Sequence, residues 1–345
     1  MKQIVLPAKT FGYDSFTEER FREQTGFSKA DAQRLFVAWG VPEEIAVYLP
    51  VVGPRGRQGG RVAKKKWSAS GLHCFVFALH RMYRPNDLIQ DKQEFRYSYS
   101  SLSAMFTGFC KWMDQTHGHR LQDIPIAKAE YFNQCIITKL REVYPAIVLP
   151  PDAENVFTFT DGNRRRICRP EGVWGVQKAF FSGDKWYCNV GSQCMCGPDG
   201  IIYDWFMGPV GRHSDQYFFH ESDLNERLRT AQIGNLIQYW TYTDKGYVAA
   251  SHTRCSHRAA DAWDRHFDTI MSTARVAVEW GFGKIQHRCS LLVKSYYLKV
   301  MSVDVERLTR CAVLFTNSHT CLHHLGSNTG VFFNCLPPTL EQYFA

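Results

Sequence analysis

The sequence predicts an α/β protein in which an all-helical N-terminal region precedes a mixed sheet flanked by helices. Before residue 145, apolar residues recur mostly at helical spacing. From residue 155, runs of β-branched and aromatic residues alternate with turn residues, which is typical of strands. These later segments follow in the order three strands, helix, strand, helix, and that order predicts an antiparallel hairpin joined to a parallel crossover.

The 345-residue chain is long enough for two domains, and its composition is that of a globular protein. Hydrophobic residues make up 45% and charged residues 21%, which excludes wholesale disorder. The sequence has no apolar window of about 18 residues and no leader-like N-terminal segment, so we expect neither a membrane-spanning helix nor a signal peptide. The formal net charge of +8 suits a polyanionic partner.

Twelve cysteines are irregularly spaced, and several of them lie inside apolar runs. In a chain without a signal peptide, this pattern predicts reduced thiols in an intracellular protein. The alternative is a structural zinc site. Its candidate ligands are Cys194 and Cys196, which fit one face of a strand, and the group His319, His323 and His324. Neither set has the paired C-x-x-C spacing of zinc knuckles.

Residues 1–52 are predicted to form short helices, because Ser28 and Asp31 make a capping signal ahead of apolar residues at helical spacing. Residues 53–66 differ, since they hold six cations, four glycines and no acid. We expect a flexible basic linker, which is either a solvated loop or an arm for nuclear import or phosphate contact. The candidates for DNA contact in this linker are Lys64, Lys65 and Lys66.

Residues 67–145 return to helical spacing. The pattern predicts three short helices, the second over 88–95 and the third capped by Ser98 or Ser100. Such a set is either a helix-turn-helix-like module or a plain bundle, and the pattern alone favours the bundle. A further helix is expected over 127–143.

The sheet region begins after a proline-rich stretch that looks like the entry to a new domain. Strands are expected over 156–160, 186–196, 201–207 and 236–242, and helices over 215–229 and 259–285. Residues 197–200, Gly-Pro-Asp-Gly, predict a hairpin turn between the second and third strands.

Two of these strands end in an aspartate, with Asp161 after the first and Asp244 after the fourth. A crossover connection places these two strands side by side in parallel, so their C-terminal ends lie together. A third acid, Glu279, interrupts an apolar helical stretch and is expected on the helix face that meets the sheet, where an unpaired charge is costly.

Three carboxylates around one point bind hard divalent cations such as Mg²⁺ or Mn²⁺. Two such ions about 4 Å apart activate water and stabilise the leaving oxygen in phosphodiester cleavage. Taken singly, each acid has a plainer interpretation, because an aspartate before a glycine is usually a turn residue and a helical glutamate is usually solvated.

Seven short segments keep a characteristic order along the chain. They are Phe159–Gly162, Ile167–Pro170, Phe181–Lys185, Pro198–Ile202, Gly208–Asp215, Asp244–Tyr247 and Ser272–Lys284. Glu279 follows Asp244 by 35 positions (279 − 244). In this order and spacing, residues 155–320 resemble the DDE endonuclease domain of PIF/Harbinger-type transposases and their domesticated relatives.

The resemblance implies an RNase H-like fold over residues 150–323, followed by a C-terminal tail over 324–345. It also implies that Asp161, Asp244 and Glu279 form a catalytic triad that holds two Mg²⁺ or Mn²⁺ ions. The implied activity is cleavage and transfer of phosphodiester bonds at transposon ends. A nuclear location and a separate Myb-like DNA-binding partner are implied as well, and we expect a homo-oligomer that acts on DNA and not on a membrane.

Asp215 is the alternative second metal ligand, in place of Asp244. It precedes a helix, so we expect it to cap that helix. The chain departs from the family's pattern at Lys245, at Val248 and at Asp268. Because Lys245 and Asp268 change the charge near the proposed site, a non-catalytic DNA- or protein-binding module is the alternative function.

Cations near the proposed site are candidates for phosphate contact. They are Arg164, Arg165 and Arg166, which follow Asp161 within five positions, and Arg275, one turn before Glu279. The plainer interpretations are a solvated strand edge for the first three and an i,i+4 ion pair for Arg275. The motifs of P-loop ATPases, serine hydrolases, zincins and dinucleotide-binding proteins are absent from the sequence.

Overall fold

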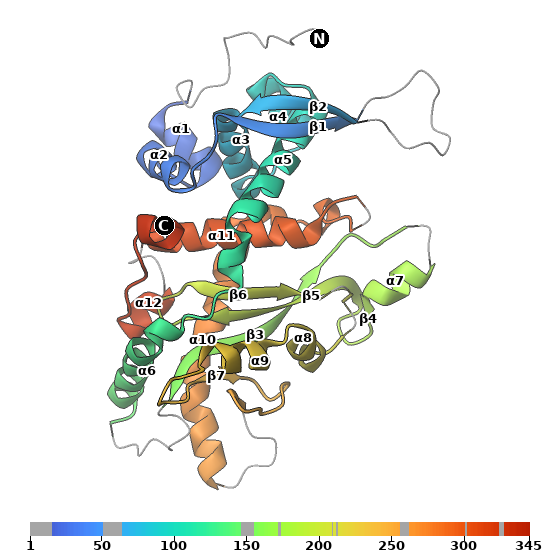
Figure 1. Cartoon of the computed structure of the whole chain (residues 1–345). Coiled ribbons are helices and arrows are strands. Elements are labelled where there is room, and N and C mark those ends of the chain that lie inside the picture. Colours follow the sequence, from blue (N-terminus) through green and yellow to red (C-terminus); the bar gives the residue numbers. More distant parts are fainter. Residues whose placement is uncertain are drawn as a thin grey trace. The chain divides into compact units, whose positions relative to one another are not determined.

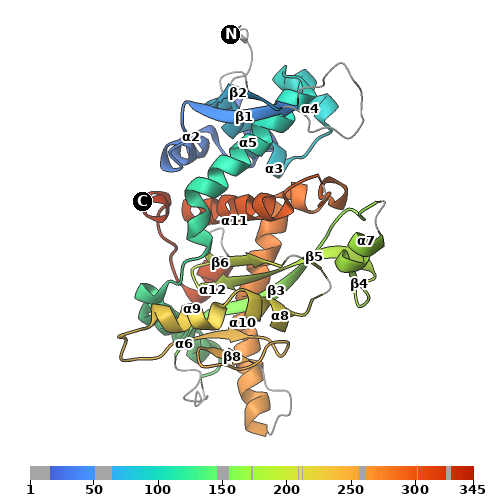
Figure 2. The same cartoon turned by 45° about the vertical axis from the view of Figure 1, so that its right-hand side comes forward.

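The computed structural model describes most of the chain (Figures 1 and 2). The described residues are 16–50, 64–145, 155–171, 174–208, 210–211, 213–255, 262–300, 302–323 and 328–345. The chain divides into two compact units, of which the first is formed chiefly by residues 1–116 and the second by residues 117–287 and 292–343.

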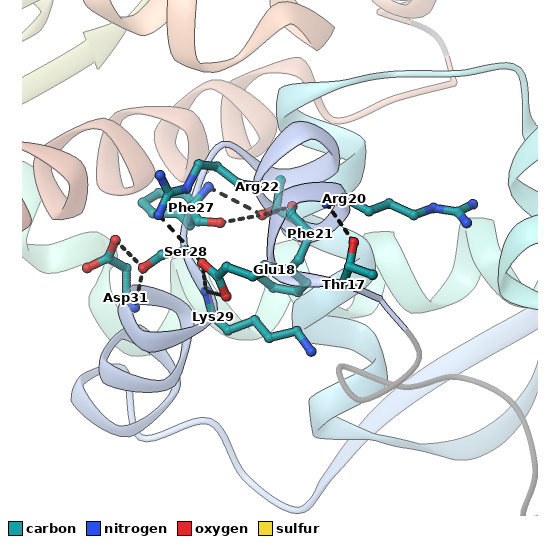
Figure 3. Close-up of polar contacts among 10 residues, drawn as sticks. Thr17, Glu18, Arg20, Phe21, Arg22, Phe27, Ser28, Lys29 and Asp31 are labelled. Carbon is teal, nitrogen blue, oxygen red and sulfur yellow. Dashed lines mark hydrogen bonds and ion pairs between the residues drawn. The ribbon is translucent and has the colours of Figure 1, made fainter.

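The first unit begins with two short helices, α1 (Glu18–Thr25) and α2 (Lys29–Ala38). The hydroxyl of Ser28 accepts a hydrogen bond from the backbone N–H of Asp31 at 3.0 Å and so caps α2 as the sequence predicts. The carboxylate of Glu18 reaches across from α1 and accepts the N–H of Lys29 at 3.2 Å (Figure 3). A carboxylate at a helix N-terminus accepts a hydrogen bond from an otherwise unpaired backbone N–H, and its negative charge is stabilised by the positive end of the helix dipole. This contact between Glu18 and Lys29 links α1 to α2.

An antiparallel hairpin follows these helices, where the sequence analysis predicted only helix and linker. Its strands are β1 (Glu44–Pro50) and β2 (Lys64–Ser70), and Glu44 pairs with Ser70. The prediction of helix throughout residues 1–52 is therefore wrong for β1, in which Ile45 and Val47 alternate as buried residues with a period of two. The last part of the expected linker also belongs to β2, while residues 53–63 lie outside the described residues.

Three helices complete the first unit, namely α3 (Gly71–Tyr83), α4 (Leu88–Phe95) and α5 (Tyr99–His117). The bounds of α4 and the cap of α5 at Ser98, which accepts the N–H of Ser101, confirm the sequence prediction. Phe77 of α3 packs edge-to-face on Phe95 of α4, with ring centroids 5.0 Å apart. Beside them, fully buried Asp91 accepts hydrogen bonds from His80 at 3.0 Å and Arg81 at 3.3 Å.

The second unit is built on a mixed sheet with the strand order β6-β5-β3-β7-β8 (Figures 1 and 2). These strands are β3 (Val156–Arg166), β5 (Tyr187–Cys196), β6 (Ile202–Met207), β7 (Trp240–Thr243) and β8 (Thr253–Cys255), and the short β4 (Phe181–Ser182) also pairs with β5. The pairs β6–β5 and β5–β3 are antiparallel, whereas β3–β7 and β7–β8 are parallel. The predicted mixed α/β class, with its hairpin and parallel crossover, is confirmed.

Helices cover both faces of this sheet. They are α6 (Ala129–Val143), α7 (Trp174–Phe180), α8 (Asp215–Glu221), α9 (Leu224–Ala231), α10 (Ala262–Arg288) and α11 (Val305–Leu322). In Figures 1 and 2, α8 and α9 lie on one face and α10 crosses the opposite face. The ring of Phe218 in α8 rests on Gly191 of β5, where any side chain would collide with it.

The helix expected over 215–229 is in fact two helices, because Asp223 adopts the left-handed region at φ 49° between them. Ser214 caps α8 by accepting the N–H of Tyr217. The prediction that Asp215 caps this helix is therefore wrong, since Asp215 is its first residue. This correction leaves the carboxylate of Asp215 available for contacts beyond its own helix.

Residues 324–345, expected as a tail, contain α12 (Asn328–Phe333) and α13 (Leu340–Phe344). Phe333 of α12 stacks on Phe159 of β3, with ring centroids 5.8 Å apart and an interplanar angle of 17°. Both rings are buried, so this C-terminal segment supplies part of the core of the second unit.

All twelve cysteines are described, and none of them forms a disulfide. Cys194 and Cys196 are fully buried in β5. The rings of His319 and His323 lie 4.6 Å apart between centroids and are tilted by 48°, while His324 lies outside the described residues. Within the described ranges, no helix has the length and apolar character needed to cross a bilayer.

The turn that joins β5 to β6 contains a buried acid, Asp199. Its carboxylate accepts the N–H of Ile201 at 3.0 Å and the hydroxyl of Tyr203 at 2.7 Å. Burial nevertheless raises the pKa of Asp199 from 3.8 to about 6, since desolvation outweighs these bonds and the nearby Lys128.

Because the folded-state pKa of Asp199 is raised, its favourable contribution to stability is complete below about pH 4 and disappears as the pH rises through 6. The two-unit change in pKa corresponds to about 3 kcal/mol. We expect Asp199→Asn to remove this part of the pH dependence. Urea unfolding at pH 4 and pH 7.5 checks it, and parallel pH profiles for the variant and the wild type would contradict it.

Candidate active site

The site forms where β3 and β7 separate. Their pairing ends at Phe159 and Tyr242, yet β3 continues to Arg166 with β5 as its partner. Asp161 thus lies inside β3, just beyond the last residue paired with β7, and does not end the strand as predicted. Asp244 directly follows β7 at the same edge. The parallel pairing brings the two acids together for the reason that the sequence analysis gave.

Asp215 joins these two acids from the N-terminus of α8. Its carboxylate lies so close to Gly162 that a Cβ at this position would collide with it. A Cβ at Gly246 would lie 2.9 Å from Oδ1 of Asp244 and 3.6 Å from Oδ2 of Asp215. Gly162 and Gly246, which lie one and two positions after Asp161 and Asp244, therefore make room for a third carboxylate.

Backbone donors orient two of the three carboxylates. Oδ1 of Asp161 accepts the N–H of Gly162 at 2.8 Å, and Oδ1 of Asp244 accepts the N–H of Gly246 at 2.7 Å. Burial raises the pKa of Asp161 to about 6 against the opposing effects of Arg275 and Gly162, and repulsion by Asp244 and Asp215 adds to the increase. The three acids are thus close enough for their charges to interact.

Arg275 of α10 connects Asp161 to Glu279. Its Nη1 lies 2.6 Å from Oδ2 of Asp161, and its Nη2 lies 2.9 Å from Oε1 of Glu279. The sequence placed Glu279 on the buried face of the helix, and this is wrong, because 54% of its side chain is exposed. Residues such as Ala274 and Val278 occupy the buried face instead, so Glu279 lies at the rim of the site.

The arginines after Asp161 have three different environments. Arg164 donates to the carbonyl of Gly211 at 2.7 Å and pairs with Asp215 at 3.5 Å. Burial raises the pKa of Asp215, and Arg164 opposes this increase. Arg165 is buried and donates to the carbonyl of Leu292. Only Arg166 of these three is exposed, so Arg165 does not reach solvent from its strand.

The lysines proposed for DNA contact belong to the other unit. Lys66 is exposed in β2, whereas the side chains of Lys64 and Lys65 are outside those that the structure describes. The two residues that depart from the family's pattern are also placed. Lys245 is exposed beside Asp244, and Asp268 of α10 accepts a hydrogen bond from the hydroxyl of Tyr242 at 3.4 Å.

A buried tyrosine, Tyr247, completes the site and was missed in the sequence analysis. Only 2% of the residue is exposed, and its hydroxyl has no hydrogen-bond partner among the described residues. Burial raises its pKa far above the usual range, and the charges of Asp215 and Asp161 raise it further. The sequence feature that could have identified Tyr247 is its position directly after the Asp244-Lys245-Gly246 turn. Hydrophobic periodicity could not, because it does not reveal which loop residues are buried.

The donor set fits a hard divalent cation. Carboxylate oxygens are the ligands that Mg²⁺ prefers, and beside them the buried Tyr247 hydroxyl has no hydrogen-bond partner in the described part of the protein. In the described part of the chain, no three His, Cys, Asp or Glu residues are already arranged as a metal site. Arg275 accounts for part of this, since it pairs with Asp161 and Glu279.

Comparison with protein families gives a match that covers the region of the candidate site. Residues 160–317 match the family model described as DDE superfamily endonuclease. The match contains all four acids of the candidate site and supports a DDE transposase-derived family for this region. No curated protein and no solved structure matches the chain. For the DDE region, the match suggests transposase-like nuclease activity, and its superfamily generally uses divalent metal ions.

Proposed function

We propose that this protein is a metal-dependent DNA endonuclease of the transposase type, or a domesticated descendant that retains the activity. The observation that carries the proposal is that Asp161 and Asp244 converge where β3 and β7 separate, with Glu279 joined to Asp161 through Arg275, within the region matched to DDE endonucleases. The strand order, three antiparallel strands followed by two parallel ones, supports an RNase H-like fold for this unit.

In this proposal, Asp161, Asp244 and Glu279 hold the cations, with Asp215 as the alternative to Asp244. When bound, Mg²⁺ or Mn²⁺ ions activate water and stabilise the leaving oxygen of the cleaved phosphodiester. The N–H groups of Gly162 and Gly246 hold the aspartates in place. Arg275 compensates the charges of Asp161 and Glu279, and its guanidinium is placed to contact a phosphate at the same edge.

The proposal extends to the biological setting that the PIF/Harbinger resemblance implies. There, cleavage exposes a 3′-hydroxyl at a transposon end, which then attacks target DNA. The protein acts in the nucleus as a homo-oligomer, together with a separate Myb-like DNA-binding protein. The net charge of +8 is consistent with a nucleic-acid partner.

The test of this function is cleavage of supercoiled plasmid by the purified full chain. We expect nicking in the presence of Mg²⁺ or Mn²⁺ and its complete loss in EDTA, because the clustered carboxylates need the cations to act on a phosphodiester. Nicking that persists in EDTA would overturn the metal mechanism.

A non-catalytic DNA- or protein-binding module is the second candidate function. The specific observation in its favour is Arg275, which already pairs with two of the four acids, at 2.6 Å and 2.9 Å. In this case the protein would bind plasmid without cleaving it, even with Mn²⁺ and a transposon-end duplex supplied.

A further inference from the structure

A cavity of about 670 Å³ opens beyond the C-terminal end of β3, away from the carboxylates. Its walls come from the end of β3, from α7, from the turn between β4 and β5, and from the 3₁₀ helix Ser295–Tyr297. Figure 1 shows α7 and β4 beside the start of β5. All of these elements belong to the second unit, and the volume is in the range of small-ligand sites.

Exposed aromatic rings form part of the wall. Trp186 is 83% exposed and Tyr296 is 54% exposed, although large apolar side chains are normally withdrawn from water. Trp186 adopts the left-handed region at φ 58°, and its N–H donates to the carbonyl of Ser182 at 2.9 Å. A non-glycine residue in this conformation is strained, so the turn adopts a backbone conformation that costs free energy and places the indole at the surface.

The cavity is also positively charged. Arg166, Arg169 and Lys178 line it, and none of the lining residues that the structure describes is acidic. Arg166 lies over the ring of Tyr187, with 5.6 Å from Cζ to the ring centroid. Arg169 donates to the side-chain oxygen of Gln177 at 3.1 Å, and no ion pair between Arg169 and an acid is formed within the described residues. Exposed aromatic rings interleaved with cations are the composition of a surface that binds single-stranded nucleic acid.

We propose that this cavity binds an unpaired base of single-stranded DNA. The base stacks on Trp186 and Tyr296, and Arg166, Arg169 and Lys178 contact the flanking phosphates. This inference rests on DNA being the substrate of the site at Asp161. The two places are linked by β3, along which Arg166 lies five positions after Asp161, about 16 Å of extended chain. A strand displaced at the cleavage site can therefore continue into the cavity.

Single-stranded DNA fits better than a duplex, because the faces of paired bases are already covered by their neighbours in the stack. A base that has left the stack offers its face to an aromatic side chain, and such contacts tolerate any sequence. The cavity therefore holds a strand without selecting its sequence.

Binding of a fluorescent single-stranded oligonucleotide in EDTA tests the inference without any need for cleavage. We expect Trp186→Ala and Tyr296→Ala each to weaken the affinity at least about fivefold, and Trp186→Phe to restore most of it. The matched control is Tyr131→Ala, which removes a 49%-exposed aromatic side chain from α6, outside the cavity. It should leave the affinity unchanged.

Photo-crosslinking of the wild-type protein to an oligonucleotide that contains 5-iododeoxyuridine provides a readout that needs no variant. Crosslinks to Trp186 or Tyr296 support the proposal, and they decide the matter even if a substitution prevents folding. Wild-type affinity in both alanine variants, crosslinks outside the cavity, or equal competition by duplex DNA would overturn it. A failure to cleave plasmid would count against the nuclease alone, since this binding is measured without metal.

Discussion

Replacement of Asp161 by Asn, Asp244 by Asn or Glu279 by Gln is expected to reduce Mg²⁺- or Mn²⁺-dependent cleavage by about 100-fold or more. Each change keeps the shape of the side chain and removes one negative charge from the proposed cation site. The three effects should not add, because residues that act as one unit lose their function together. Plasmid nicking by the purified variants measures the loss, and circular dichroism checks that each variant is folded.

Asp215→Asn is the matched control, because it changes an acid of the same cluster that is paired with Arg164. We expect this variant to retain measurable turnover. Cleavage that survives in Asp244→Asn and disappears in Asp215→Asn would instead make Asp215 the second ligand. The structure makes this comparison worthwhile, since both carboxylates lie beside Gly246.

The largest effect on stability is expected from Asp91→Ala in the first unit. This substitution leaves His80 and Arg81 buried without the carboxylate that accepts their hydrogen bonds. Removal of one partner from a buried ion pair typically costs about 3–5 kcal/mol, because the remaining buried charge loses its counter-charge. Urea unfolding of the full chain, followed by tryptophan fluorescence, measures the loss.

Arg22→Ala is the control for this prediction, because Arg22 forms an exposed i,i+4 pair with Glu18 in the same unit. Exposed pairs of this kind contribute little, so its unfolding transition should match that of the wild type. A similarly small effect of Asp91→Ala would show that water enters the site and solvates Arg81.

Elements with local signals could be predicted from the sequence. The short helix α4 has its predicted bounds because turn residues precede it, and the hairpin of β5 and β6 follows from the Gly-Pro-Asp-Gly turn. The hairpin of β1 and β2 was missed, since its two strands are separated by the basic glycine-rich stretch and neither is recognisable without the other. Strand β8 has only three residues, which is too short for a period to be visible.

The candidate site also combines contacts that the sequence predicts with contacts that it does not. The placement of Asp161 and Asp244 follows from the parallel pairing of two predicted strands, which is a topological rule. The bridge from Arg275 to Asp161 joins residues 114 positions apart, and the approach of Asp215 to Gly162 depends on how α8 packs on the sheet. Such contacts are decided by tertiary packing, so no local pattern contains them. The exposure of Trp186 was not predictable for the same reason.

The stacking of Phe333 on Phe159 has a consequence for the biosynthesis of this protein. The two rings are separated by 174 positions (333 − 159), which a ribosome translates in roughly 10 to 35 s. Throughout this interval the nascent sheet lacks the aromatic ring that packs on Phe159. All four acids of the candidate site have nevertheless been synthesised once residue 279 is added. A message truncated between Glu279 and Phe333 would therefore encode every proposed ligand in a chain with an unfinished core, and this product would be a substrate for chaperones and proteases.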